Sequence, residues 1–277
     1  MNPLRTLLEN LIDYAGLFPP SALPMNRAVE NYARYRSSPE SWMLGRFVVP
    51  VSRLDELEAD LQGAAPLVSA LIGGDLESDL ERIGRSPLPI DTIEMKAADA
   101  DQIESAMKRI PPKLMPYFET AGIELIPAIR AAGGRAKIRT GGITPQAFPP
   151  AGAVARFLAA CAKNEVAFKA TAGLHHPLRC YHALTYSADG PSGWMFGFLN
   201  VFAAAVLARG GAETATLERV LEEESPDAFT FLDARMEWRG NGIGAAEIAE
   251  ARRGFAISFG SCSFEEPVQD LKALGLL

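Results

Sequence analysis

The stretch AKIRTGGITPQAFPPAGAVARFLAACAKNEVAFKATAG (residues 136–173) contains two short β-rich runs separated by a longer segment of helical periodicity. The runs have the length of strands, and the segment between them has the length of a helix. Two strands joined through a helical crossover lie parallel in one sheet. This stretch therefore predicts one strand–helix–strand unit of an α/β fold.

The same alternation of strand and helix extends along the whole chain. The candidate strands are Tyr14–Phe18, Gly45–Val51, Leu67–Ile72, Asp91–Lys96, Leu114–Glu119, Arg135–Arg139, Ala167–Thr171 and Ala256–Ser261. Eight strands close a TIM-type barrel, and 277 residues suit one such barrel better than two average domains. We predict a single (β/α)8 barrel domain over residues 1–277. The alternative is a doubly wound open sheet, but no Gly-x-Gly-x-x-Gly loop follows the first strand.

Local signals support several of the helices. Ser52 and Asp75 each precede an amphipathic segment and are expected to cap its first N–H groups. The most apolar run, FLNVFAAAVLA (residues 198–208), is too short to cross a bilayer and is expected to be a core helix.

Two segments interrupt the alternation. A long loop, GLHHPLRCYHALTYSADGPSGW (residues 173–194), follows the seventh strand, and FTFLDARMEWRGNG (residues 229–242), which resembles a strand or hairpin, precedes the eighth. Long insertions in compact domains are usually functional or disordered, and barrels carry their active sites after the strands. We interpret the first segment as a lid over an active site.

The net charge, the first residues and the cysteines limit the partners and the compartment that we expect. The chain carries a formal net charge of -7, which argues against nucleic acid or an anionic membrane as a partner. Its first residues do not have the pattern of a secretory signal, and its three cysteines lack metal-finger spacing. We expect a cytoplasmic protein with reduced thiols. A homo-oligomer is an open alternative to a monomer.

Charged residues lie inside four consecutive strands, TIEMKA (92–97), PYFETA (116–121), AKIRTGG (136–142) and AFKATAG (167–173). Strands of a parallel barrel are covered on both faces, so charges inside them are costly unless they are paired or in use. Because alternate residues share a face, each strand would present its polar side chains together near its carboxyl-terminal end. The residues concerned are Glu94, Lys96, Glu119, Lys137, Arg139, Lys169 and Thr171.

These side chains predict an amine-based active site. Two ammonium groups close together repel, so one of Lys137 and Lys169 is expected to lose its proton and become a nucleophile. Glu94 and Glu119 oppose this, but two acids facing three lysines and an arginine leave a net positive charge. The alternative is a neutralising network of buried ion pairs without catalysis.

Small residues after the sixth, seventh and eighth strands are candidates for binding an anion. Barrels often hold phosphate with the loops after their last two strands. Gly173, Gly260 and Ser261 would form the cradle, with Arg139 as the cationic partner and Lys96 and Thr171 as further contacts. Ordinary tight turns explain each glycine equally well.

The strands AKIRTGG and AFKATAG resemble the two lysine strands of deoxyribose-phosphate aldolase and related class I aldolases. The resemblance covers about forty residues and implies that Lys137 forms a Schiff base and that Lys169 is the neighbouring cation. Arg139 stands where that family has a small hydroxyl residue, and Glu94 matches its acidic relay residue only loosely. Over its whole length the chain more closely resembles a bacterial family, and that resemblance supplies no function.

The chain's three histidines, His175, His176 and His182, all fall in the long loop after the seventh strand. We favour an acid or base role for His175, because imidazole titrates near neutral pH. A metal site with Glu94 and Glu119 has weak support, because no His-x-His or His-Glu-x-x-His spacing is present.

Two further side chains admit more than one interpretation. Cys262 could be a nucleophile, but we favour a small buried hydrophobe. Asp13 and Tyr14 stand at the start of the first candidate strand, where Asp13 could reach a substrate at the rim or turn the chain.

The favoured function is therefore a lyase of aldolase type that acts on a small anionic carbonyl compound. Lys137 or Lys169 would supply the amine, and Glu94, Glu119 or His175 would move protons. This function needs no metal or other cofactor. The alternatives are a metal-assisted hydrolase or lyase and a non-catalytic barrel that binds a small molecule, since this fold hosts many chemistries.

Overall fold

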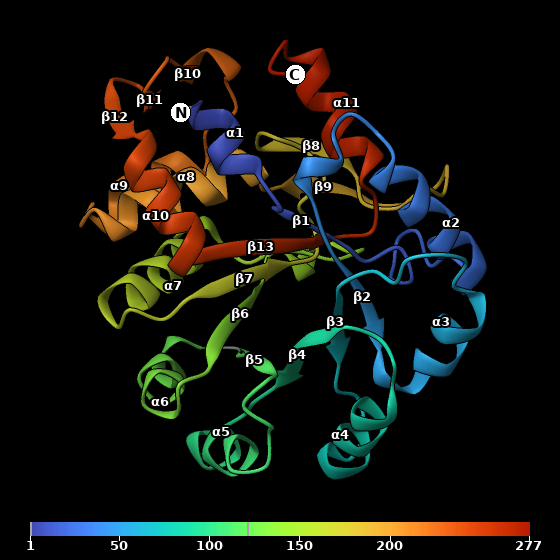
Figure 1. The fold of residues 1–277 in the computed structure, drawn as a ribbon. Coiled ribbons are helices and arrows are strands. Elements are labelled where there is room, and N and C mark those ends of the chain that lie inside the picture. Colours follow the sequence, from blue (N-terminus) through green and yellow to red (C-terminus); the bar gives the residue numbers. More distant parts are fainter. Residues whose placement is uncertain (1, 121) are drawn as a thin grey trace.

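The structure, a computed structural model, describes residues 2–120 and 122–277. Its barrel strands are Ile12–Tyr14 (β1), Leu44–Pro50 (β2), Val68–Leu71 (β3), Ile90–Lys96 (β4), Met115–Glu119 (β5), Arg135–Arg139 (β6), Phe168–Thr171 (β7) and Ala256–Ser261 (β13). All neighbouring pairs are parallel, and the sheet closes in the order β1–β13–β7–β6–β5–β4–β3–β2 (Figure 1). The predicted TIM-type barrel is confirmed.

Helices surround this barrel (Figure 1). The α-helices are Pro3–Leu8 (α1), Met25–Arg36 (α2), Leu54–Asp60 (α3), Leu76–Arg85 (α4), Ala100–Met107 (α5), Ile126–Ala132 (α6), Ala151–Lys163 (α7), Phe198–Arg209 (α8), Thr214–Leu221 (α9), Ala245–Gly254 (α10) and Glu265–Ala273 (α11). Short 3-10 turns are Ser41–Met43, Val51–Arg53, Ile123–Leu125, Pro145–Ala147 and Pro226–Ala228.

One of the two predicted helix caps is present. The Asp75 carboxylate accepts a hydrogen bond of 3.0 Å from the Ser78 N–H at the start of α4, as expected. The prediction for Ser52 is wrong, because Ser52 lies within a 3-10 turn and α3 begins two residues later without a side-chain cap.

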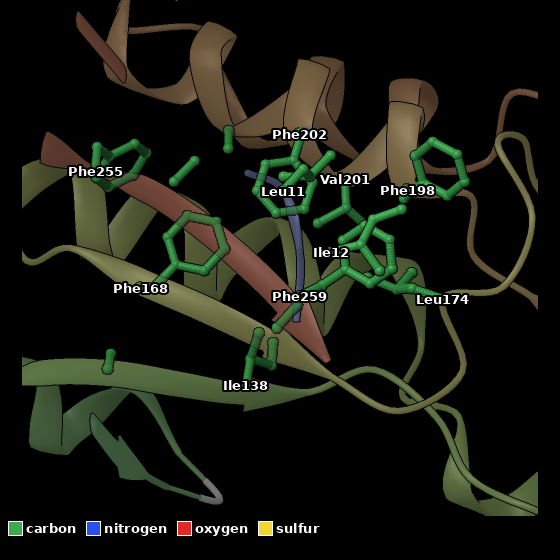
Figure 2. Packing of buried hydrophobic residues seen from close by; sticks show 14 of the residues in the cluster. Leu11, Ile12, Ile138, Phe168, Leu174, Phe198, Val201, Phe202, Phe255 and Phe259 are labelled. Carbon is green, nitrogen blue, oxygen red and sulfur yellow. The ribbon is translucent and has the colours of Figure 1, made fainter. Parts of the chain in front are cut away.

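The apolar run of residues 198–208 forms the predicted core helix α8. Phe198, Val201 and Phe202 of this helix face the outer side of β13 and β7 (Figure 2). Phe198 stacks on Phe259 with 5.4 Å between ring centroids, and Phe202 stacks on Phe168 at 6.3 Å. In the part of the chain that the structure describes, no helix is long and apolar enough to cross a membrane.

The first strand differs from its prediction. We expected Tyr14–Phe18, whereas β1 is Ile12–Tyr14. Asp13 therefore lies inside the strand, in register with Gly260 of β13, and is almost fully buried. The prediction failed because a carboxylate in an apolar run reads as a strand boundary, and the groups that make its burial tolerable lie far away in the sequence.

The two predicted insertions contain small antiparallel sheets. The loop after β7 contains the hairpin of Cys180–Ala183 (β8) and Ser192–Met195 (β9). The segment before β13 forms a three-stranded sheet of Phe229–Phe231 (β10), Arg235–Trp238 (β11) and Asn241–Gly244 (β12). The hairpin lies near α11, whereas the three-stranded sheet lies beside α1 (Figure 1). Of these two insertions, the long loop is the one that reaches the end of the barrel where the charged strands finish.

Candidate functional site

A cavity of about 360 Å³ lies at the carboxyl-terminal ends of the barrel strands. Its polar lining includes Glu94, Lys137, Arg139, Lys169, Thr171, His175 and Cys262. Its apolar lining includes Phe18, Val48, Leu71 and Ile143. A concave apolar site with a few convergent polar groups is the usual form of a small-molecule pocket.

The parallel register brings the charged side chains together. Glu119 aligns with Lys137 on the next strand, and Lys137 aligns with Lys169 on the strand after it. Glu94 aligns with Tyr117 of β5. Residues at one level of neighbouring parallel strands that face the same side lie close together, so the alternation seen in the sequence produces one cluster.

Glu94 connects the two lysines. Its Oε1 lies 2.5 Å from Nζ of Lys169, and its Oε2 lies 2.9 Å from Nζ of Lys137. Ser69 on β3 donates a hydrogen bond of 2.7 Å to Oε1. The Glu94 and Lys169 side chains are each 2% exposed, and that of Lys137 is 5% exposed. One buried carboxylate is therefore shared between both ammonium groups.

Asp13 completes the cluster, whereas from the sequence we expected it at the rim of the barrel or in a turn. Its Oδ2 lies 2.7 Å from Nζ of Lys169 and accepts a hydrogen bond of 2.7 Å from Ser258. Its Oδ1 accepts a hydrogen bond of 2.8 Å from the Arg46 N–H. A buried ion pair is tolerated when its remaining lone pairs are satisfied in this way. The one available signal was the isolated charge between Ile12 and Tyr14.

The electrostatics of the cluster contradict one version of the neutral-amine hypothesis. Burial alone would lower the pKa of Lys169, but Asp13 and Glu94 outweigh it and raise that pKa above its ordinary value. Burial would raise the pKa of Glu94, but Lys169 and Lys137 lower it well below its ordinary range. These contacts favour the ammonium form of Lys169 and argue against it as the neutral amine.

The predicted excess of positive charge is also wrong. Asp13, Glu94 and Glu119 face Lys137, Lys169 and Arg139, which is three carboxylates against three cations. Lys96, which we had counted among the cations, is exposed and does not line this cavity. It lines a neighbouring cavity together with Glu119 and Arg139. An ammonium that stays in solvent avoids the cost of burying a charge.

Glu119 and Arg139 form the outer part of the cluster. Glu119 Oε2 lies 2.8 Å from Nζ of Lys137, and its Oε1 accepts a hydrogen bond of 3.1 Å from Nε of Arg139. Burial would raise the pKa of Glu119, but Lys137 and Arg139 lower it. The Arg139 side chain is 50% exposed, so its guanidinium lies at the boundary between the cluster and solvent.

Some of the residues predicted to cradle an anion line the cavity, and others do not. Thr171 and Gly260 line the cavity, as does Ala172. Gly173 adopts φ +75°, and a Cβ added to it would lie 2.8 Å from the Gly141 Cα. This glycine is required by the close approach of two loops. Ser261 is buried outside the cavity lining, and its carbonyl accepts a hydrogen bond of 2.7 Å from the Ala15 N–H.

The three histidines have separate environments. His175 lines the cavity, and its Nδ1 lies 2.8 Å from Oε2 of Glu266 on α11. His176 Nδ1 lies 2.6 Å from Asp270 of the same helix, and His182 is exposed on the hairpin. Cys262 is buried, as we expected, and it also lines the cavity.

A metal-ligand set was one of the alternatives. Within residues 2–120 and 122–277, no three His, Cys, Asp or Glu side chains converge in a way that could hold a metal ion. The cluster carboxylates instead contact lysines, which compete with a cation for the same oxygens.

No protein-family model matches this chain, and no curated protein matches it. Among solved structures, a mandelate oxidase crystal structure with (S)-2-phenylpropionate is similar at 12% identity and a TM-score of 0.41, covering 93% of this chain and 81% of that one. A second, with 3,3-difluoro-2-hydroxy-3-phenylpropionic acid, has 12% identity and a TM-score of 0.39, covering 91% and 80%. Similarity at this level carries no argument about function. The resemblance to class I aldolases therefore rests on the two lysine strands.

Proposed function

We propose that this barrel is an enzyme of lyase type that acts on a small carbonyl compound through the amine of Lys137. The observation that supports it most directly is the sharing of the Glu94 carboxylate between Lys137 and Lys169 at the floor of a cavity. Such an arrangement gives the two lysines different electrostatic surroundings, so that one can serve as a cation and the other as a nucleophile.

The choice of Lys137 follows from how the carboxylates are divided. Lys169 has Asp13, which contacts no other cationic side chain within hydrogen-bond distance among the described residues, and a share of Glu94. Each carboxylate that faces Lys137 is shared with a second cation, Glu94 with Lys169 and Glu119 with Arg139. Lys137 thus has the smaller share of negative charge, and we assign the amine to it for that reason.

The chemistry begins when Lys137 loses a proton to solvent. The neutral Nζ then adds to the carbonyl carbon, and the carbonyl oxygen leaves as water after receiving protons. The β-hydroxyl of the resulting iminium then loses its proton to solvent and becomes a carbonyl as the bond between the α and β carbons breaks. The electron pair of that bond forms an enamine, and the first fragment leaves as an aldehyde or ketone. Protonation of the enamine and hydrolysis of the imine release the second fragment and regenerate the amine.

In this proposal, Arg139 at the edge of the cavity recognises the substrate. Arg139 lines the cavity beside Thr171, and a guanidinium binds a carboxylate or phosphate through paired hydrogen bonds. The favoured substrate is therefore a small carbonyl compound with an acidic group at one end.

Borohydride trapping tests the proposal. The protein is incubated with pyruvate, glyoxylate, dihydroxyacetone phosphate or glyceraldehyde 3-phosphate, reduced, digested and analysed by mass spectrometry. We expect a stable adduct on Lys137 that is lost in Lys137→Ala and retained in Lys113→Ala, where an exposed lysine precedes β5 at the opposite end of the barrel. Labelling spread equally over exposed lysines, or unchanged in Lys137→Ala, would reject the Schiff-base function in favour of a binding role.

A further inference from the structure

Cys262 follows the last barrel strand and forms a chain of contacts with two titratable side chains. Its Sγ lies 3.9 Å from Nε2 of His175, which comes from the long loop after β7. The other ring nitrogen of His175, Nδ1, lies 2.8 Å from Oε2 of Glu266. A thiol, an imidazole and a carboxylate in this order are the components of an activated nucleophile, its base and the group that orients the base.

The contacts favour charge separation between sulfur and imidazole. Burial would lower the pKa of His175, but Cys262 and Glu266 raise it to about 10. Burial would raise the pKa of the Cys262 thiol, but His175 lowers it below its ordinary value. The same thiol behaves differently from Cys161, where burial alone raises the pKa and no partner compensates it.

We infer that Cys262 is a second nucleophile of the cavity, activated by His175 and oriented through Glu266, and that it adds to the carbonyl carbon of a small aldehyde. The site is accessible through the cavity, because Cys262 and His175 line it together with Lys137 and Lys169. This inference goes beyond the Schiff-base proposal and does not depend on it.

The proposed step balances without an oxidant or a reductant. The thiolate sulfur gives its electron pair to the aldehyde carbon, and the π pair of the carbonyl moves to its oxygen. The imidazolium of His175 then transfers the Nε2 proton to that oxygen. The products are a neutral hemithioacetal on Cys262 and a neutral imidazole, and the reverse steps release the aldehyde.

Other groups surround the thiol and must be included in its pH dependence. Tyr186 in the long loop has its hydroxyl 3.9 Å from Sγ of Cys262 and 3.1 Å from Oε2 of Glu266. Tyr14 of β1 also interacts electrostatically with the thiol, and the Ser21 hydroxyl donates a hydrogen bond of 3.1 Å to the Cys262 carbonyl. The pKa of both tyrosines is raised, by burial first, so they stay neutral near pH 7.

Alkylation by iodoacetamide measures thiol reactivity directly. The three cysteines provide internal references, because burial, Asp270 and Glu224 raise the pKa of Cys180 to about 11. We expect Cys262 to react at least tenfold faster than Cys180 at pH 7, as followed by peptide mass spectrometry. His175→Asn should slow Cys262 at least tenfold, whereas His182→Asn, a change in the exposed histidine of the same loop, should not. Equal rates for Cys262 and Cys180, or no effect of His175→Asn, would overturn the activation.

The pH profile of the alkylation rate distinguishes an activated Cys262 thiol from one that only packs in the interior. In the wild type, the alkylation rate of Cys262 should remain high at pH 6, where an ordinary thiol slows about tenfold for each unit below its pKa. Glu266→Gln should move the inflection of this profile to higher pH, since Glu266 stabilises the imidazolium. A Glu266→Gln variant with an unchanged inflection would remove Glu266 from the assignment.

The aldehyde step is tested by protection in a variant that cannot form the lysine adduct. Glycolaldehyde should slow the alkylation of Cys262 at least fivefold, saturably, in both the wild type and Lys137→Ala. Protection that disappears in Lys137→Ala would assign the adduct to the lysine and overturn the thiol step. Cys262→Ser separates the two proposals in the other direction, because borohydride trapping on Lys137 should persist there.

Discussion

Asp13 and Lys169 form an ion pair of 2.7 Å inside the barrel, although 156 residues separate them in the chain. The Asp13 side chain is 1% exposed and that of Lys169 is 2% exposed. Removing one partner of a buried pair leaves an uncompensated charge, which is more costly than losing a surface pair. The pair connects β1 and β7 across β13, in addition to the backbone pairing of these strands.

Asp13→Asn should destabilise the protein by about 3 kcal/mol, because breaking a buried pair typically costs this much. Urea unfolding followed by circular dichroism measures the change. Glu250→Gln is the control, since Glu250 pairs with Arg209 at the surface and its side chain is 63% exposed. Equal losses in the two variants would show that the buried pair contributes no more than an exposed one.

The pKa of Glu94 and that of Glu119 lie below their ordinary values in the folded protein. A group whose pKa is depressed by folding stabilises the native state above its unfolded pKa, and this contribution is lost as the pH falls through the folded pKa. The free energy of unfolding should therefore decrease below about pH 4.3, the ordinary value for glutamate. Lys169 has the opposite sign, and its contribution is lost only at high pH.

Glu94→Gln isolates the part of this acid dependence that comes from Glu94. The difference in free energy of unfolding between the wild type and the variant should be largest at pH 7 and should shrink between about pH 4.3 and pH 3. Urea titrations at pH 7, 5, 4 and 3 measure it. A difference that stays constant over this range would mean that Glu94 does not stabilise the fold through its charge.

The barrel and the inner lysines could be predicted because their signals are local. Strand length and alternation are contained within a few residues, and parallel register aligns Lys137 with Glu119 on one side and with Lys169 on the other. Asp13 could not be predicted in this way, because its partners Lys169 and Ser258 lie far from it in the sequence. Lys96 shares the alternation of Glu94, but its side chain is exposed and lines the neighbouring cavity.

The pairing of Cys262 with His175 could have been inferred more fully than it was. Both residues follow neighbouring strands, β13 and β7, within a few positions of the strand ends. What the sequence could not supply is Glu266, since its contact with His175 depends on where α11 packs. A thiol near a histidine becomes a site only when the imidazole is oriented.

Gly173→Ala should destabilise the protein by about 1–3 kcal/mol, because a non-glycine residue is strained at positive φ. The new Cβ would also lie 2.8 Å from the Gly141 Cα and 2.8 Å from a ring carbon of Phe148. Gly210→Ala is the matched control, with φ -75° and its nearest contact at 3.4 Å. Thermal unfolding should show a lower midpoint for the first variant only, and equal midpoints would refute the steric argument.

Glu119→Gln tests how the negative charge of Glu119 affects the reactivity of Lys137. Glu119 contacts Nζ of Lys137 at 2.8 Å without contacting Lys169, so the substitution removes one negative charge from Lys137 and leaves the Asp13–Lys169–Glu94 contacts in place. The ammonium form of Lys137 becomes less favourable, and the neutral amine becomes more abundant. With glyoxylate and cyanoborohydride at pH 7, we expect the initial rate of Lys137 labelling to rise about threefold or more.

Glu124→Gln controls for a general change in charge, because Glu124 is exposed and lines the neighbouring cavity that Glu119 also lines. It should leave the labelling rate of Lys137 within experimental error of the wild type. A slower rate in Glu119→Gln would instead mean that Glu119 is needed to move the proton during imine formation, and that this role outweighs its hold on the ammonium. The pH dependence distinguishes the two effects: release of the ammonium accelerates labelling only where Lys137 is mostly protonated in the wild type, whereas loss of proton transfer slows it at every pH.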